Sequence, residues 1–192
     1  ISQWSHDFRP AYKKVAIVTN LLPDIPILSV TATATPMVLE DIYDTLGVVE
    51  IAEYSLGTRR DNMAIRIINT KDDWVNSVKE YENTIIYTQS KKLAEKLSDE
   101  LTSRSVNSMY YHAGMSPDSR ERVHQAFLDG TVRVVVATIA FGMGIDKADI
   151  RHVINFGVPT DLETYYQEIG RAGRDGLPCQ ATLFYTARDF ST

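Results

Sequence analysis

Hydrophobic and polar positions follow two periods that take turns along the chain. Short apolar, β-branched runs predict strands, and segments with apolar residues three and four positions apart predict helices. The run VRVVVA at 132–137 is nearly continuous in valine and predicts a strand buried on both faces. Strands are expected at 27–30, 64–68, 84–87, 108–111, 133–137, 152–155 and 181–185. Helices are expected at 10–22, 36–46, 72–81, 91–103, 117–128 and 162–169.

The alternation predicts an α/β fold, a parallel sheet flanked by helices on both faces. Residues 56–62, LGTRRDN, show neither period and are expected to form a linker. All but one of the expected strands follow it, so residues 63–192 are expected to form a complete domain. Residues 1–55 hold one expected strand and two helices, too little for a sheet of their own. They are expected to be the end of a domain that begins upstream.

Composition is that of an ordinary globular chain, with 44% hydrophobic and 23% charged residues. The chain contains no apolar run of membrane-spanning length and no signal-peptide pattern, so neither membrane insertion nor secretion is expected. The single cysteine, Cys179, cannot form an internal disulfide, and no Cys/His cluster has zinc spacing, so no metal site is expected. The net charge of −5 argues against an unspecific basic coat for nucleic acid. A few placed donors can still bind phosphates locally.

The string QEIGRAGRDG combines two arginines with glycines. Gln167, Arg171 and Arg174 are four and three positions apart, so a helix running through them would place them on one face. Gly170 and Gly173 leave room beside the guanidiniums for another backbone or a phosphate. Forked cations beside bare backbone suit a triphosphate. A glycine-broken helix end with two solvated arginines is the alternative.

This string resembles the sixth motif of the RecQ family of DNA helicases, which are two-lobed, RecA-like translocases. The resemblance implies that Arg174 is the arginine finger at the ATP γ-phosphate and that Arg171 is its phosphate-contacting neighbour. It places Gln167, Gly170 and Gly173 in the same site. An arginine finger is worth about 10³ to 10⁵ in rate.

The string VATIAFGMGIDK is a buried strand that opens into a Gly-x-Gly loop. It offers backbone N–H groups and a hydroxyl at the carboxyl edge of the sheet, where ligands of open α/β folds bind. The string resembles the fifth motif of the same family. The resemblance implies a DNA-phosphate contact for Thr138 and places Gly144 and Asp146 at the nucleotide site. Simple packing is the alternative for Phe141 and Met143.

Two strings near the start resemble further RecQ elements. SVTATAT resembles the third motif, which implies that Thr31 and Thr33 link the nucleotide and DNA sites. SQWSHDFRP resembles the aromatic-rich loop of the family, which implies base stacking by Trp4 and Phe8 and a phosphate contact from Arg9. The alternatives are an ordinary strand end with a helix cap, and aromatics that anchor a loop to a core.

Two weaker matches lie between these strings. IIYTQSK resembles the fourth motif, with Thr88 and Gln89 where the family often has Cys and Asn, and it makes Ser90 a DNA-binding candidate. YYHAGM matches another family string and makes His112 a possible DNA-side contact, with a structural histidine as the alternative. Asp61 stands where the family commonly has proline.

The resemblance covers essentially the whole chain. It implies the end of a first RecA-like lobe followed by the second lobe of an ATP-dependent helicase that moves 3′ to 5′ on single-stranded DNA and unwinds duplexes in repair and recombination. It implies ATP and Mg²⁺ as cofactors, and single-stranded and forked DNA as partners. The chain contains neither a GxxxxGK[ST] loop nor the acidic motif that binds Mg²⁺. ATP and Mg²⁺ are therefore expected to be held mainly upstream, and the chain alone is expected to be inactive.

Two alternatives remain open. One is an RNA helicase of the same two-lobed class, and the other is a non-catalytic lobe that binds nucleic acid or a partner protein. The substrate class implies the nucleus in a eukaryote, and the cytoplasm or nucleoid in a bacterium.

Overall fold

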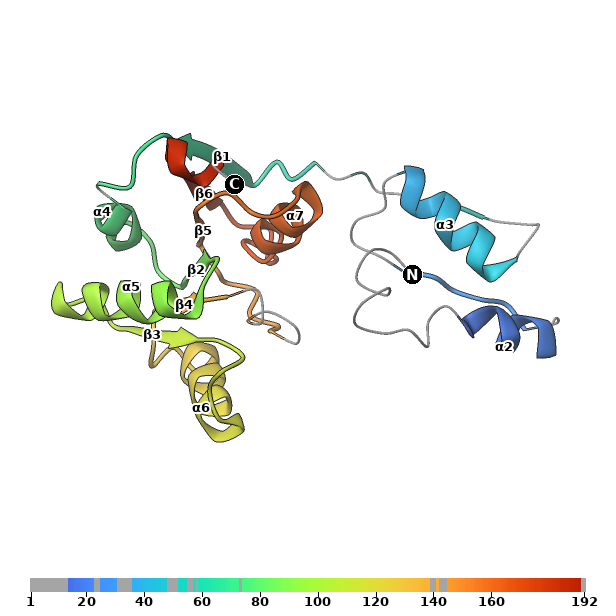
Figure 1. Ribbon diagram of the computed structural model, residues 1–192, viewed down its shortest axis with the longest axis horizontal. Coiled ribbons are helices and arrows are strands. Elements are labelled where there is room, and N and C mark those ends of the chain that lie inside the picture. Colours follow the sequence, from blue (N-terminus) through green and yellow to red (C-terminus); the bar gives the residue numbers. More distant parts are fainter. Residues whose placement is uncertain are drawn as a thin grey trace. The chain divides into compact units, whose positions relative to one another are not determined.

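The computed structural model describes residues 14–22, 25–30, 36–47, 52–54, 57, 59–72, 74–138, 141 and 145–190. The chain divides into two compact units, Ile1–Arg59 and Arg60–Thr192. This boundary lies inside the segment 56–62 that the sequence analysis expects to be a linker. Figure 1 shows the elements of both units.

Two helices are described in the first unit, α2 (Val15–Leu21) and α3 (Pro36–Leu46). Proline at the first position of α3 has the backbone angle that a helix start requires. Val38, Ile42 and Leu46 follow at four-residue spacing, so they share one helix face and form a small buried cluster.

The prediction of a strand at 27–30 is wrong. Residues 26–30 form no strand, and the side chains of Leu28 and Val30 are largely exposed. A strand requires a neighbouring strand to bond its N–H and C=O groups, and an apolar, β-branched run does not by itself supply one.

The second unit is a doubly wound α/β domain. Its strands are β1 (Met63–Ile68), β2 (Thr84–Thr88), β3 (Ser108–Tyr111), β4 (Val134–Ala137), β5 (His152–Phe156) and β6 (Cys179–Phe184). Its helices are α4 (Trp74–Lys79), α5 (Lys91–Ser103), α6 (Pro117–Leu128) and α7 (Leu162–Ile169), followed by the 3-10 helix η2 (Ala187–Phe190). All the strand pairs are parallel, in the order β1-β6-β5-β2-β4-β3. The predicted parallel α/β fold is confirmed.

Helices cover both faces of this sheet. Successive residues of a strand point to opposite faces, so neighbouring residues pack against different helices. Ile85 and Tyr87 pack in one buried cluster with residues of α6 and α7. Ile86, between them, packs in the other cluster with residues of α4 and α5. β4 is fully buried, as its valine run predicts.

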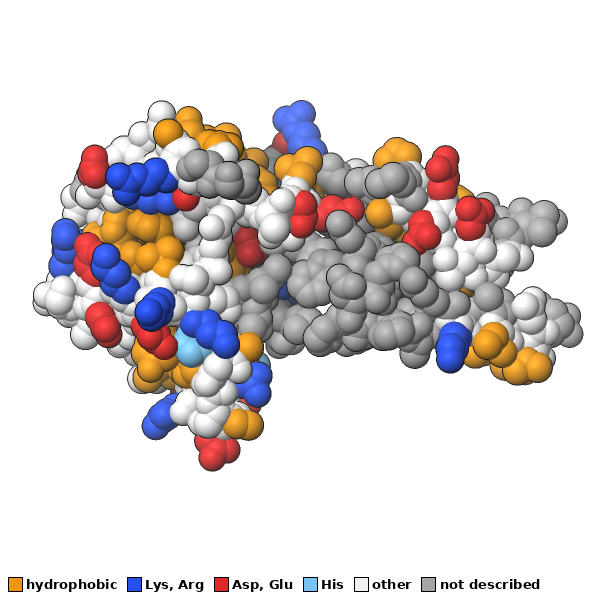
Figure 2. Space-filling model, viewed as in Figure 1, with side chains coloured by type: hydrophobic (Ala, Val, Ile, Leu, Met, Phe, Trp, Pro, Cys, Tyr) orange, Lys and Arg blue, Asp and Glu red, His pale blue; other side chains and the backbone are white. Residues whose placement is uncertain are grey.

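Acidic and basic side chains are interspersed on the face of the second unit that Figure 2 shows. This mixture agrees with the small net charge of the chain. Among the described residues, no helix has the length and apolar character needed to cross a bilayer.

Candidate functional site

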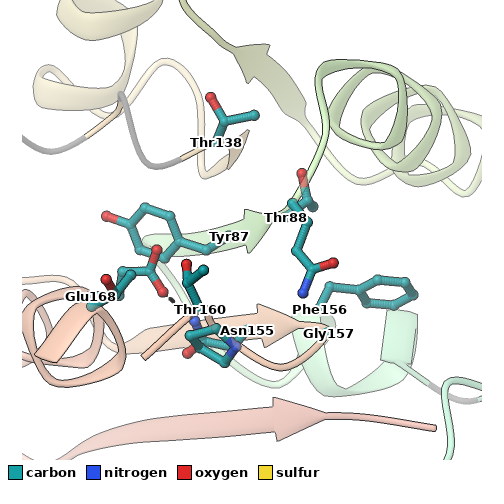
Figure 3. Close-up of a pocket in the computed structure, with 11 residues that line it drawn as sticks. Tyr87, Thr88, Thr138, Asn155, Phe156, Gly157, Thr160 and Glu168 are labelled. Atoms are coloured by element: carbon teal, nitrogen blue, oxygen red, sulfur yellow. Dashed lines mark hydrogen bonds between the residues drawn. The ribbon is translucent and has the colours of Figure 1, made fainter. Parts of the chain in front are cut away.

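A cavity of about 390 Å³ lies at the carboxyl ends of β2, β4 and β5 (Figure 3). Ligands of open α/β folds bind at this edge of the sheet, where the loops after neighbouring strands diverge. Many of the lining side chains carry hydroxyl, amide or carboxyl groups, which suits a ligand held by hydrogen bonds. The lining residues are Tyr87, Thr88, Gln89, Thr138, Asn155, Phe156, Gly157, Pro159, Thr160, Thr164 and Glu168.

Glu168 supplies the carboxyl group of this lining, and it is only 8% exposed. Its Oε2 accepts a hydrogen bond from Asn155 Nδ2, drawn as a dashed line in Figure 3. Burial raises the pKa of Glu168 to about 7, although Asn155 and the charge of Arg171 both act to lower it. The carboxyl group therefore changes charge near neutral pH, a property that is enriched at functional sites.

Tyr87 lies on the same side of the cavity as Glu168 in Figure 3. Its buried hydroxyl donates to the Phe141 carbonyl at 3.0 Å. Burial raises the pKa of Tyr87, and the charge of Arg171 acts in the opposite direction. Arg171 therefore lies close enough to act electrostatically on both Tyr87 and Glu168.

The loop after α7 carries both candidate arginines. α7 ends at Ile169, and residues 170–175 form turns rather than a continued helix. The helix predicted at 162–169 is confirmed, and it ends before Arg171, so Gln167, Arg171 and Arg174 do not share one helix face. Glycine is a poor helix former, and the chain turns away at Gly170, the residue that caps the helix.

These turns bring Arg174 to the segment that follows β4. Its Nη1 donates to the Ile145 carbonyl at 3.2 Å, and the same atom lies 3.8 Å from Asp146 Oδ1. The Arg174 side chain remains 39% exposed and that of Asp146 is 96% exposed. The structure thus brings together two candidate residues from separate sequence strings, with part of the guanidinium still open to a ligand.

Gly173 is packed against the chain itself. It has a φ of +58°, and a Cβ at this position would lie 2.5 Å from Cys179 Sγ and 2.7 Å from Asn62 Nδ2. The space left by the missing side chain is therefore filled by two neighbouring residues. At Gly170 a Cβ would lie 2.9 Å from the Tyr166 carbonyl oxygen.

The described ranges contain no group of three or more His, Cys, Asp and Glu side chains placed to hold a metal ion. The forked guanidinium of Arg174, whose side chain is 39% exposed, has a donor geometry that suits phosphate oxygens. Arg174 is therefore the residue of the loop after α7 that fits a phosphate group.

Residues 63–176 match the family model for the helicase conserved C-terminal domain. The chain belongs to this helicase family. It is 40% identical to the ATP-dependent DNA helicase RecQ of Bacillus subtilis, over 98% of this chain and 33% of that protein. It is 41% identical to the putative ATP-dependent RNA helicase R290 of Acanthamoeba polyphaga mimivirus, over 99% of this chain and 36% of that protein.

Among solved structures, the DEAD-box protein SrmB of E. coli, crystallised with regulator of ribonuclease activity A, matches with a TM-score of 0.62 and 26% identity. The match covers 69% of this chain and 82% of that one. These similarities confirm the RecQ resemblance and the RecA-like fold of the helicase C-terminal lobe. The chain spans about a third or less of the length of the curated relatives it matches.

Two DNA-side candidates of this helicase lobe lie at strand ends. Thr138 follows β4 and lines the cavity, and its N–H donates to the Tyr111 carbonyl at 3.2 Å. Ser90 follows β2 and caps α5, where its Oγ accepts the Leu93 N–H at 3.2 Å. Ser90 is exposed, so it combines a structural role with access to solvent.

His112 directly follows β3 and lies buried in this helicase lobe. Its side chain is 7% exposed, and its Nε2 lies 3.0 Å from Glu95 Oε1. The other ring nitrogen, Nδ1, accepts the Gly114 N–H at 3.2 Å. Both nitrogens thus have partners within the chain, and the DNA-side contact of His112 stays a prediction.

The remaining candidates lie outside the described residues. They are Trp4, Phe8, Arg9, Thr31, Thr33 and Gly144. Conversely, the cavity contains Tyr87, Asn155 and Glu168, which the sequence analysis did not select. Two of them stood inside strings that the sequence analysis singled out, Tyr87 in the fourth-motif string and Glu168 in the sixth-motif string.

Proposed function

We propose that the intact protein is a RecQ-like, ATP-dependent DNA helicase that moves 3′ to 5′ along single-stranded DNA and unwinds duplex and forked DNA. This chain supplies its second lobe. The observation that carries the proposal is the contact of Arg174 with Ile145 and Asp146, in a chain of the helicase C-terminal family.

Arg174 acts as the arginine finger in this proposal. ATP, bound with Mg²⁺ mainly by residues upstream of this chain, supplies the phosphoryl group that is transferred to water. The Ile145 carbonyl and Asp146 hold the guanidinium in one orientation, and its exposed part approaches the γ-phosphate. The fixed positive charge stabilises the negative charge that develops on the transferring group.

Arg171 supports the same site from beside Glu168 and Tyr87. On the DNA side, Thr138 and Ser90 offer hydroxyls to the backbone of one strand, while Trp4 and Phe8 supply stacking faces. Closure of the two lobes on ATP then moves the protein along that strand.

Replacement of Arg174 by alanine in the intact protein tests this proposal. We expect ATP binding to change little and DNA-stimulated hydrolysis to fall at least about a hundredfold, because the finger acts on the transition state. Arg122→Ala, which removes an arginine from α6, is the matched control and should leave turnover unchanged. Near-normal turnover in the Arg174→Ala protein would refute the finger assignment.

The same assay separates DNA from RNA as the substrate. The similarity to R290, named as a putative RNA helicase, favours RNA as the second candidate. Stronger stimulation of hydrolysis by single-stranded DNA than by RNA of the same sequence supports the DNA helicase. The reverse order would replace it with an RNA helicase of the same class.

A further inference from the structure

Residues 170–178, between α7 and β6, carry Arg171 and Arg174, and we call them the arginine loop. Two residues at the start of the second unit contact this loop. Arg60 Nη2 donates to the carbonyls of Ala172 at 2.9 Å and Gly173 at 2.7 Å. Asn62 Nδ2 donates to the carbonyls of Gly173 and Leu177, both at 2.9 Å. Arg60 Nε also donates to Asn62 Oδ1 at 3.2 Å. Arg60 and Asn62 together form what we call the carbonyl clamp.

The clamp bonds the backbone on both sides of Arg174. Ala172 and Gly173 precede this arginine and Leu177 follows it, in a loop of turns that has no ladder of its own. Hydrogen bonds from a guanidinium are stronger than those between neutral groups. The clamp therefore fixes the stretch of backbone from which the Arg174 side chain extends.

The fit of the clamp to the loop is tight. A Cβ at Gly173 would lie 2.7 Å from Asn62 Nδ2, so only glycine leaves room for this donor. The Asn62 carbonyl in turn accepts the Cys179 N–H at 2.9 Å, where β6 begins. The clamp is thus anchored to the sheet on one side and to the loop on the other.

We propose that Arg60 and Asn62 are positioning residues for the proposed ATPase reaction, which hold the loop so that Arg174 reaches the γ-phosphate. This inference rests on the proposed function. Arg60 is also the first residue of the second unit. The segment that joins the two units therefore leads directly into the residues that orient the finger.

A double-mutant cycle in the intact protein tests this inference. Arg60→Ala should lower the DNA-stimulated kcat at least about tenfold and change the KM for ATP less than about twofold, because the loop acts after ATP is bound. Arg60→Lys should restore part of the loss, since an ammonium donates to carbonyls but lacks the planar fork. Arg66→Ala, which removes an exposed arginine of β1, is the control and should leave kcat unchanged.

The decisive measurement combines Arg60→Ala with Arg174→Ala. If Arg60 acts through Arg174, the double variant should have the kcat of Arg174→Ala within about twofold. Multiplied losses would overturn the inference, as would a normal kcat for Arg60→Ala beside a slow Arg174→Ala. A normal kcat for Arg174→Ala itself would instead refute the proposed function. Should Arg60→Ala fail to fold, Arg60→Lys takes its place in the cycle.

Discussion

At the scale of single residues, two glycines of the arginine loop have the same backbone geometry but different surroundings. Gly173 and Gly176 have φ values of +58° and +81°, a region that disfavours side chains. At Gly173 a Cβ would overlap Cys179 and Asn62, whereas at Gly176 nothing lies within 4 Å of that position. Comparing alanine substitutions at these two glycines therefore separates the cost of backbone strain from the cost of steric overlap.

Gly173→Ala should lower the free energy of unfolding by about 2 to 4 kcal/mol, the sum of left-handed strain and overpacking. Gly176→Ala should cost only about 1 kcal/mol, since it carries the strain alone. Urea denaturation of both variants and the wild-type chain measures the difference. Equal midpoints for the two variants would show that the packing around Gly173 contributes nothing.

At the scale of elements, hydrophobic periodicity predicted the helices and strands whose formation depends mainly on local sequence. The strands and helices of the second unit follow from alternation and three-to-four spacing. The prediction of a strand at 27–30 failed because an apolar run does not by itself supply the partner that a strand needs, whereas the helix at 162–169 was predicted with its observed bounds. Pattern cannot select Asn155 and Glu168 as a pair, because their contact depends on how β5 and α7 pack.

The contact between α7 and β5 predicts a pH effect on stability. Burial raises the pKa of Glu168 from 4.5 to about 7, so its stabilising contribution is complete below pH 4.5 and is lost as the pH rises through 7. The full loss is on the order of 3 kcal/mol. In Glu168→Gln, which cannot ionise, the free energy of unfolding relative to wild type should therefore increase between pH 5 and pH 8.

Urea titrations at both pH values measure this difference. Burial lowers the pKa of His152 from 6.5 to about 4, so its contribution to the free energy of unfolding is complete above pH 6.5 and is lost as the pH falls through 4. This histidine is present in both proteins, so its effect cancels in the comparison. Glu121→Gln on the exposed face of α6 is the control and should show the same difference at both pH values. A Glu168→Gln difference that stays constant with pH would contradict the raised pKa.

At the scale of the whole molecule, the chain carries the arginine side of the proposed ATP site and no GxxxxGK[ST] loop. We expect ATP hydrolysis, with or without single-stranded DNA, only from a version extended upstream through such a loop. Hydrolysis by the 192-residue chain itself would require a phosphate site other than the proposed one. Inactivity of both versions would favour a non-catalytic binding lobe.

The strand order of the second unit also affects how the domain is made. β1 is made before the other described strands of this unit, yet its neighbour in the sheet is β6, the last of them, with Met63 opposite Cys179. The nascent sheet can assemble β2, β3, β4 and β5 while β1 still lacks its partner. Pairing of such distant segments is intrinsically slow. The arrival of β6 both completes the six-stranded sheet and brings Cys179 to Asn62, so the arginine loop gains this support only after β6 has been made.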